Sequence, residues 1–195
     1  MIEAPTLILA SQSPRREQIL SMVGLPFDII PANIDEAPYS HLPPIKMVET
    51  LSLLKAEVVA DFHPEAIVIG SDTVVSIEKR VFGKPLTETN AKKMLRELSG
   101  KTHQVITGVS LVQRSTTLEY TFYHITEVTV SKLTDTEIKG YVTHYKPLDK
   151  AGSYGIQDGF GKFITQIEGC YFNVVGLPLS KVYKELCALY PQLWS

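Results

Sequence analysis

The sequence predicts an α/β or α+β fold built on a mixed, partly antiparallel sheet that is flanked by helices. In the first 100 residues, short apolar runs alternate with helical segments, as in βαβ units. Residues 102–114 and 117–132 then resemble two long strands joined by a turn near Ser115, and the strands of such a hairpin run antiparallel. The length of 195 residues fits one domain or one domain with two lobes, and we expect a single domain over residues 1–195.

The strands of the first half are predicted from short apolar runs. These runs occupy residues 6–10, 27–30, 66–69 and 74–77. The third run ends in Gly70-Ser71-Asp72-Thr73 before the fourth resumes as strand. This pattern predicts that Asp72 lies at the end of a buried strand.

The helices are predicted from their capping residues. Ser13 and Pro14 start a helix to about Val23, before Gly24, and Pro43-Pro44 start a longer one to Ala60. Three more helices are predicted: one from Thr87 to Gly100, one from the capping box Thr134–Glu137 to His144, and a last one that begins at Leu179. In the second helix, the apolar residues at helical spacing are Met47, Leu51, Leu54 and Val58.

Composition excludes several classes of protein. The net charge of −2 provides no basic field for nucleic acid, so phosphate binding must come from local residues. Two cysteines do not form a disulfide framework, and we expect both to be free thiols. The N-terminus lacks the pattern of a signal peptide, and no apolar run approaches the roughly 20 residues of a membrane span. These observations favour a cytoplasmic protein.

The strongest local signal is the segment from Leu7 to Arg16. A buried strand leads into a Ser-rich turn and a helix start, where unpaired N–H groups attract anions. The hydroxyls of Ser11 and Ser13 can add donors, and the guanidiniums of Arg15 and Arg16 suit phosphate oxygens. An ordinary helix cap followed by two solvated arginines explains the same residues equally well.

Four further sites are candidates for chemistry. Asp72 can ligate Mg²⁺ or act as a general base, or it can simply form a turn. Lys84, between Gly and Pro, can neutralise a phosphate or face solvent, and Asp35 and Glu36 can complete a metal site or form a solvated acidic turn. In the Gly-rich segment 148–157, the Gln157 amide can read a base edge, or the segment can be a plain connection. The five histidines are scattered without metal-ligand spacing, and we expect them at the surface or satisfied locally.

Together these segments resemble the Maf family. The matching motifs, in chain order, are LILASQSPRR at 7–16, VIGSDTVV at 68–75, GKP at 83–85, LSGKTHQVITGV at 98–109, PLDKAGSYGIQ at 147–157 and VVGLP at 174–178. The match covers almost the whole chain. The resemblance implies two lobes around a deep cleft, as in ITPase-like folds, a divalent metal (Mg²⁺ or Mn²⁺) and a homodimer.

The resemblance also implies an activity. It indicates a house-cleaning nucleoside triphosphate diphosphatase, an acid-anhydride hydrolase that releases the monophosphate and pyrophosphate. Thr73 and the Tyr-Gly-Ile-Gln run ending at Gln157 are similar to the branch that acts on dTTP and UTP, with modified pyrimidine nucleotides as further substrates. The branch that acts on 7-methyl-GTP tends to carry Asp-Gln where this chain has Asp72-Thr73.

The roles that the resemblance implies fall into three groups. Asp72 is the proton acceptor, Lys84 is a second catalytic residue that binds phosphate, and Asp72 holds the metal with Asp35 or Glu36. The substrate-binding residues are Ser11, Arg15, Arg16, Lys55, Thr73, Lys150 and Gln157, of which Arg15, Thr73 and Gln157 are associated with substrate choice. Because free Asp is a weak base, we expect Asp72 to position water beside a metal. The alternative is a nucleotide-binding regulator of cell division that needs no catalysis.

Overall fold

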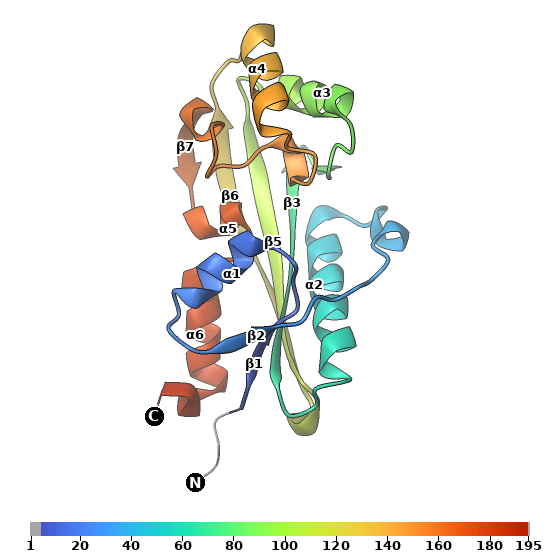
Figure 1. Cartoon of the computed structure of the whole chain (residues 1–195), viewed down its shortest axis with the longest axis vertical. Helices are drawn as coiled ribbons and strands as arrows, with labels where there is room; N and C mark the ends of the chain where they lie inside the picture. The colour runs from blue at the N-terminus through green and yellow to red at the C-terminus, as the bar shows by residue number, and fades with distance from the viewer. Residues whose placement is uncertain (1–4, 195) are drawn as a thin grey trace.

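The computed structural model describes residues 5–194 and contains one sheet with helices on both faces (Figure 1). The strands are β1 (Leu7–Leu9), β2 (Phe27–Ile29), β3 (Ile67–Ile77), β4 (Arg80–Phe82), β5 (Thr102–Gln113), β6 (Leu118–Val130) and β7 (Ile164–Glu168). The helices are α1 (Pro14–Ser21), α2 (Pro44–Ala60), α3 (Glu88–Leu98), α4 (Asp135–Tyr145), α5 (Tyr171–Val175) and α6 (Leu179–Leu189).

The sheet is mixed, as predicted. Its seven strands run in the order β2-β1-β3-β5-β6-β7, and β4 pairs with β3 outside this path. β1 pairs in parallel with β2 and with β3, whereas the pairs β3–β5, β5–β6 and β6–β7 are antiparallel. The predicted hairpin is β5–β6, and its connection is the short 3₁₀ turn Arg114–Thr116 around Ser115.

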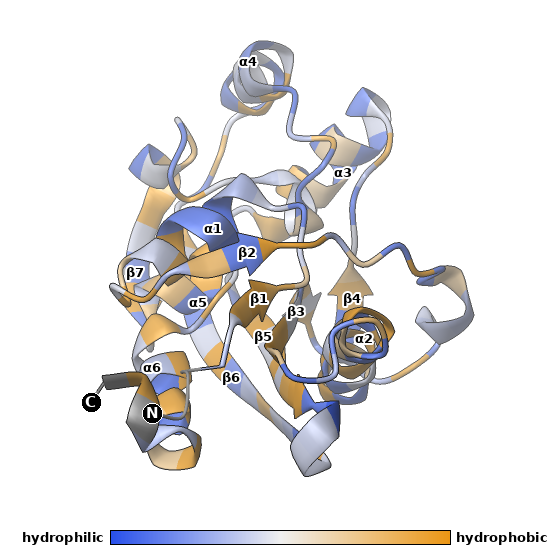
Figure 2. Cartoon of the chain, turned by 60° about the horizontal axis from the view of Figure 1, so that its bottom comes forward, coloured by the Kyte–Doolittle hydropathy of each residue, from blue (hydrophilic) through white to orange (hydrophobic). Residues whose placement is uncertain are grey.

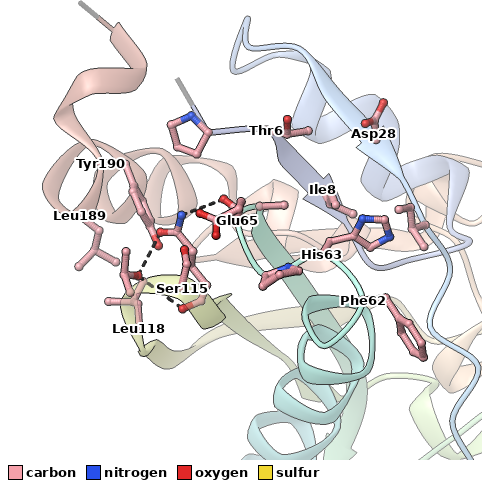
Figure 3. A pocket seen from close by; sticks show the side chains of 16 residues that line it. Thr6, Ile8, Asp28, Phe62, His63, Glu65, Ser115, Leu118, Leu189 and Tyr190 are labelled. Atoms are coloured by element: carbon pink, nitrogen blue, oxygen red, sulfur yellow. Dashed lines mark hydrogen bonds between the residues drawn. The ribbon is translucent and has the colours of Figure 1, made fainter. Parts of the chain in front are cut away.

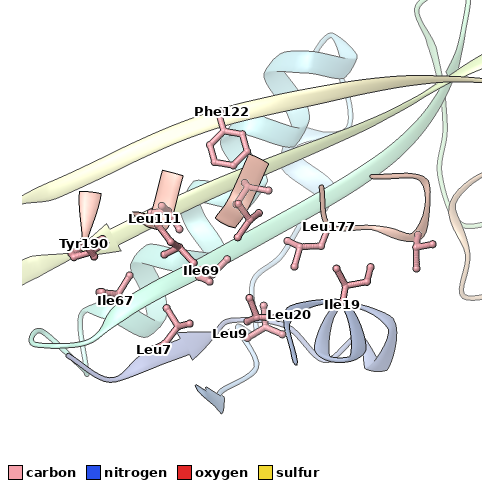
Figure 4. Close-up of a cluster of buried hydrophobic side chains, with 14 residues drawn as sticks. Leu7, Leu9, Ile19, Leu20, Ile67, Ile69, Leu111, Phe122, Leu177 and Tyr190 are labelled. Atoms are coloured by element: carbon pink, nitrogen blue, oxygen red, sulfur yellow. The ribbon is translucent and has the colours of Figure 1, made fainter. Parts of the chain in front are cut away.

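Two of the apolar clusters, one toward each end of the sheet, divide the molecule into two lobes. In the first, α1 and α6 cover the lower part of the sheet, where Ile19 and Leu20 of α1 pack toward Leu9 and Ile69 (Figure 4). In the second, α3 and α4 cover the other end (Figure 1). The strands β3, β5 and β6 contribute to both clusters. Viewed from below, the strands are mainly apolar where they lie between α1 and α2, while the outer face of α1 is polar (Figure 2).

Local capping signals predicted most helix ends correctly. Thr87 accepts a hydrogen bond from Asn90 at the start of α3, and Thr134 forms the complete capping box of α4 with Glu137. Ser13 is the N-cap of α1 and Pro14 its first residue, as predicted, although the Ser13 side chain makes no capping hydrogen bond. The backbone N–H of Ser13 donates instead to Ser11 Oγ over 3.2 Å.

The buried face of α2 differs from the predicted one. Met47 and Leu54 are only partly buried and Val58 is exposed, whereas the neighbouring face that carries Lys55 is buried. Close packing against the sheet determines which face of α2 is buried, because an added Cβ at Gly70 or Gly108 would lie only 2.0 or 2.3 Å from α2 carbonyl oxygens. The two glycines therefore let the α2 backbone lie directly on β3 and β5.

Asp72 does not lie at a strand end. The strand β3 is continuous from Ile67 to Ile77, so Asp72 stands near its middle and the predicted interruption at Gly70 is wrong. Pairing with β5 from Val68 to Ser76 keeps this polar stretch extended. The short elements β4, β7 and α5 were also not predicted from the sequence.

Other sequence expectations concern membranes and thiols. The helices within residues 5–194 lack the combination of length and apolar character that crossing a lipid bilayer requires. Cys170 and Cys187 are free thiols, as expected.

Candidate active site

The candidate site lies at a gap in the edge of β3. The strand β5 occupies one edge of β3, while β1 pairs with residues 67–69 and β4 with residues 75–77 on the other edge. Residues 70–74 therefore have no strand beside them on that second edge among the described residues. Asp72 lies in this gap, on the face toward α2, because it is paired with Gly108. Thr73 points to the opposite face.

One ammonium group joins two carboxylates in front of α2. Lys55 Nζ lies 2.7 Å from Asp72 Oδ1 and 2.7 Å from Glu36 Oε1. Lys55 and Asp72 are buried, with 9% and 7% of their surfaces exposed. Burial acts to raise the pKa of Glu36, but the hydrogen bond and charge of Lys55 and the charges of Lys84 and Arg16 outweigh it and lower that pKa. Both carboxylates are thus held close to one cation.

Arg16 is fixed on the other face by three neutral acceptors. Its Nε donates to the Gly176 carbonyl oxygen over 2.9 Å, Nη1 to Ser11 Oγ over 3.2 Å, and Nη2 to Thr73 Oγ1 over 3.1 Å. Burial lowers the pKa of the guanidinium, the negative charge of Asp72 opposes this, and Arg15 adds to the lowering. Because none of these three acceptors is charged, the positive charge of Arg16 is not cancelled by a bonded carboxylate.

Ser11 is positioned by the same contacts. Its oxygen accepts from the backbone of Ser13 and from Arg16, so its own hydroxyl proton is left to donate. Ser11 is buried at the end of β1, where Ala10 donates to the carbonyl of Ile69. The turn after β1 is therefore tied to the gap in β3.

Some predicted site residues lie at the margin of this group. Arg15 Nη1 lies 3.7 Å from Asp149 Oδ2, and Lys150 Nζ donates to Asp149 Oδ1 over 3.1 Å. Asp149 thus joins α1 of one lobe to the segment after α4 of the other. Lys84 is exposed on the loop after β4, and its charge reaches Glu36. Gln157 is exposed on the loop after Tyr154.

The two candidate acidic residues beside Asp72 have separate places. Glu36 contacts Lys55, whereas Asp35 is exposed and its Oδ1 accepts from the backbone of Ala37 over 3.0 Å at the start of a 3₁₀ turn. Within residues 5–194, no three His, Cys, Asp or Glu side chains converge as a metal site. Mg²⁺ commonly takes one or two carboxylates together with substrate phosphates, and Asp72 with Glu36 fits that pattern. Asp35 does not.

The sequence did not indicate the residues that hold the Arg16 guanidinium in place. The Gly176 carbonyl accepts from Arg16 and from Ser71, and Thr107 contacts Thr73 over 3.0 Å. Gly176 has a φ of +130°, which favours glycine strongly, and it follows Val174-Val175 in a motif that already stood out. The Val-Val-Gly-Leu-Pro motif at 174–178 was the available signal, but its partner Arg16, 160 residues away, was not.

A separate cavity of about 1050 Å³ lies away from these residues (Figure 3). It opens beside Thr6, His63, Ser115 and Tyr190, near the hairpin turn and the end of α6. None of the predicted catalytic, substrate-binding or metal residues lines it. Convergent charge, rather than the size of the hollow, therefore marks the candidate active site.

Comparison with known proteins identifies the family of the chain. Residues 6–189 match the family described as Maf, Maf-like protein. The chain belongs to the Maf family. It is 48% identical over 180 residues to dTTP/UTP pyrophosphatases of Bacillus cereus (strain AH820) and Bacillus thuringiensis subsp. konkukian (strain 97-27), covering 92% of this chain and 93% of each relative.

A solved structure supports the fold. The HAM1 protein from Coxiella burnetii superposes with a TM-score of 0.50 at 14% sequence identity, over 96% of this chain and 99% of that one. At this identity the likeness concerns the fold alone. This chain therefore has the mixed-sheet architecture that its sequence predicts.

Proposed function

We propose that this Maf-family chain hydrolyses dTTP and UTP, and modified pyrimidine nucleotides of the same shape, to the monophosphate and pyrophosphate. The observation that carries the proposal is the pair of groups at the β3 gap: a carboxylate held by Lys55 and, beside it, a guanidinium bound only by neutral oxygens. Binding a triphosphate requires positive charge that no carboxylate neutralises, and activating a water molecule requires an oriented hydrogen-bond acceptor. The names of the Bacillus relatives support the choice of substrates.

The phosphates are assigned to the Arg16 side of the gap. Arg16 has N–H groups beyond its three internal bonds, and Ser11 has its hydroxyl proton to donate. Lys84 and Lys150 extend positive charge along the loops on either side. Arg15, Thr73 and Gln157 are assigned to substrate choice, in keeping with the resemblance to the dTTP and UTP branch.

Asp72 is assigned to the attacking water. Lys55 binds Oδ1 and orients the carboxylate, so Oδ2 is the oxygen available to accept a hydrogen from water. The water oxygen forms a bond to phosphorus as the bond to the bridging oxygen of pyrophosphate breaks. The proton of the water passes toward Asp72, and pyrophosphate leaves with its charge held by Arg16 and Lys84.

A divalent cation is part of the proposal. Asp72 and Glu36 would hold Mg²⁺ or Mn²⁺, which when bound supplies neutralising charge and lowers the pKa of water. Lys55, predicted as a phosphate ligand, is assigned instead to holding these two carboxylates, because both of its contacts are acidic.

The biological setting follows from the activity and the composition. We place the protein in the cytoplasm as a house-cleaning enzyme that removes unwanted nucleotides, with no nucleic-acid partner. The homodimer expected from the resemblance stays a prediction, and light scattering of the purified chain tests it.

The test is pyrophosphate release from a panel of triphosphates with Mg²⁺ or Mn²⁺. We expect turnover of dTTP and UTP to exceed that of 7-methyl-GTP, and Asp72→Asn to lower kcat by about 10²-fold or more. Asp28→Asn, on the exposed side of β2, is the matched control and should keep wild-type turnover. Faster hydrolysis of 7-methyl-GTP would overturn the substrate assignment. Nucleotide binding without any turnover would favour the regulator.

A further inference from the structure

A line of hydroxyl groups crosses the sheet beneath Arg16. Thr73 Oγ1 on β3 lies 3.0 Å from Thr107 Oγ1 on β5, directly opposite in the strand register. Thr107 Oγ1 in turn donates to the carbonyl oxygen of Asn173 on α5 over 3.1 Å. Thr107 and Asn173 have no exposed surface, so neither can touch a substrate.

One direction of the hydrogen bonds in this line gives each hydroxyl its nearer acceptor. The Asn173 carbonyl can only accept, and when Thr107 gives it its one hydroxyl proton over 3.1 Å, Thr107 accepts from Thr73. Thr73 therefore donates to Thr107 and turns its lone pairs to Arg16 Nη2. The other acceptor open to Thr73, the Gly176 carbonyl, is farther away at 3.5 Å.

Asn173 anchors the far end of the line. Its side-chain amide donates to the Val105 carbonyl over 2.9 Å and to Thr126 Oγ1 over 3.0 Å, which ties α5 to β5 and β6. Gly176, three residues later, presents the carbonyl that receives Arg16 Nε. Asn173 therefore supports Arg16 twice, through Thr107 and through the position of Gly176.

We propose that Thr107 is a positioning residue of the pyrophosphatase reaction: it holds the proton of Thr73 away from Arg16, so that Arg16 presents its remaining N–H groups to the substrate phosphates. The proposal rests on the function proposed above.

The test compares Thr107→Val with Thr107→Ser. Valine keeps the shape of threonine without the hydroxyl, and serine restores the hydroxyl. We expect about a tenfold fall in kcat/KM for dTTP with valine and recovery with serine, since a small misplacement of a clamping group is costly. Thr121→Val is the matched control: its Oγ1 contacts Ser110 over 2.8 Å, and it should keep wild-type kcat/KM. Thr107→Ala replaces the valine variant if that one does not fold.

Two readouts separate positioning from general damage. Affinity for inorganic pyrophosphate, measured by calorimetry, should weaken about tenfold in Thr107→Val. In an Arg16→Ala background, Thr107→Val should cause no further loss, because its effect passes through Arg16.

The outcomes distinguish the two proposals. Wild-type kcat/KM in Thr107→Val, or the same loss with and without Arg16, would overturn the positioning role. If the wild type hydrolyses no triphosphate, the proposed function fails, while the pyrophosphate affinities of Thr107→Val and Thr121→Val still decide whether Thr107 orders the anion site.

Discussion

The buried histidine of β5 should make stability depend on pH in a specific window. Among the five histidines, His103 has only 2% of its surface exposed, and its Nε2 pairs with the Tyr154 hydroxyl over 2.7 Å. Its Nδ1 is buried without a hydrogen-bond partner among the described residues. Burial lowers the pKa of His103 from 6.5 to about 4. The expectation that every histidine is exposed or locally hydrogen-bonded therefore holds for Nε2 of His103 but not for its Nδ1.

The sign of the effect follows from where the proton binds. As the pH falls below 6.5, the unfolded chain takes up a proton at His103, whereas the folded chain does so only near pH 4. The contribution to stability is therefore complete above pH 6.5 and is lost as the pH falls toward 4. For these two pKa values the free energy of unfolding drops by about 2 kcal/mol between pH 7.5 and pH 5.

Urea unfolding followed by circular dichroism measures this loss. His103→Gln removes the titrating group and keeps an amide that can pair with Tyr154. We expect the variant to start lower in stability and to lose about 2 kcal/mol less than the wild type over the same pH range. Every other titration is common to both proteins and cancels in the difference. Parallel curves for the two proteins would refute the burial argument.

Three further predictions concern packing and charge. Gly108→Ala should cost about 1–3 kcal/mol in urea unfolding because the new Cβ meets the α2 backbone, whereas Gly140→Ala on α4, with nothing within 4 Å, should gain roughly 0.5–1 kcal/mol. Gly176→Ala, at a φ of +130°, should cost about 1–3 kcal/mol and lower kcat/KM by moving the carbonyl that holds Arg16; unchanged kinetics would contradict that role. Lys55→Met should cost about 3–5 kcal/mol by leaving a buried carboxylate unpaired, and adding Asp72→Asn should recover part of it; a further loss in the double variant would speak against the ion pair.

Local chemistry explains the elements that the sequence predicted well. The caps at Thr87 and Thr134 act within one turn of helix, so four neighbouring residues carry the signal. The long strands 102–113 and 118–130 were predictable from their apolar and β-branched residues on either side of a turn. Asp72 and Arg16 were predicted as site residues from motif and chemistry together, and the structure places Asp72 against Lys55 and Arg16 against Thr73.

The rest depends on contacts between distant segments. Which face of α2 is buried depends on Gly70 and Gly108. These glycines lie in β3 and β5, so the spacing of apolar residues within α2 does not indicate them. The short strands β4 and β7 owe their conformation to pairing with β3 and β6 rather than to their own residues. Thr107 read as an ordinary strand residue, because its role needs Thr73 and Asn173 beside it.

The three long strands also limit how the protein can move. No flexible linker separates the lobes along β3, β5 or β6, since each strand passes from one apolar cluster into the other. We infer that the two lobes do not rotate as rigid bodies about a flexible hinge. Any closing on a nucleotide must come from a change in sheet twist or from the loops that carry Lys84 and Lys150. Asp72 and Thr73, in the middle of the continuous β3, would then stay in place while the walls around them adjust.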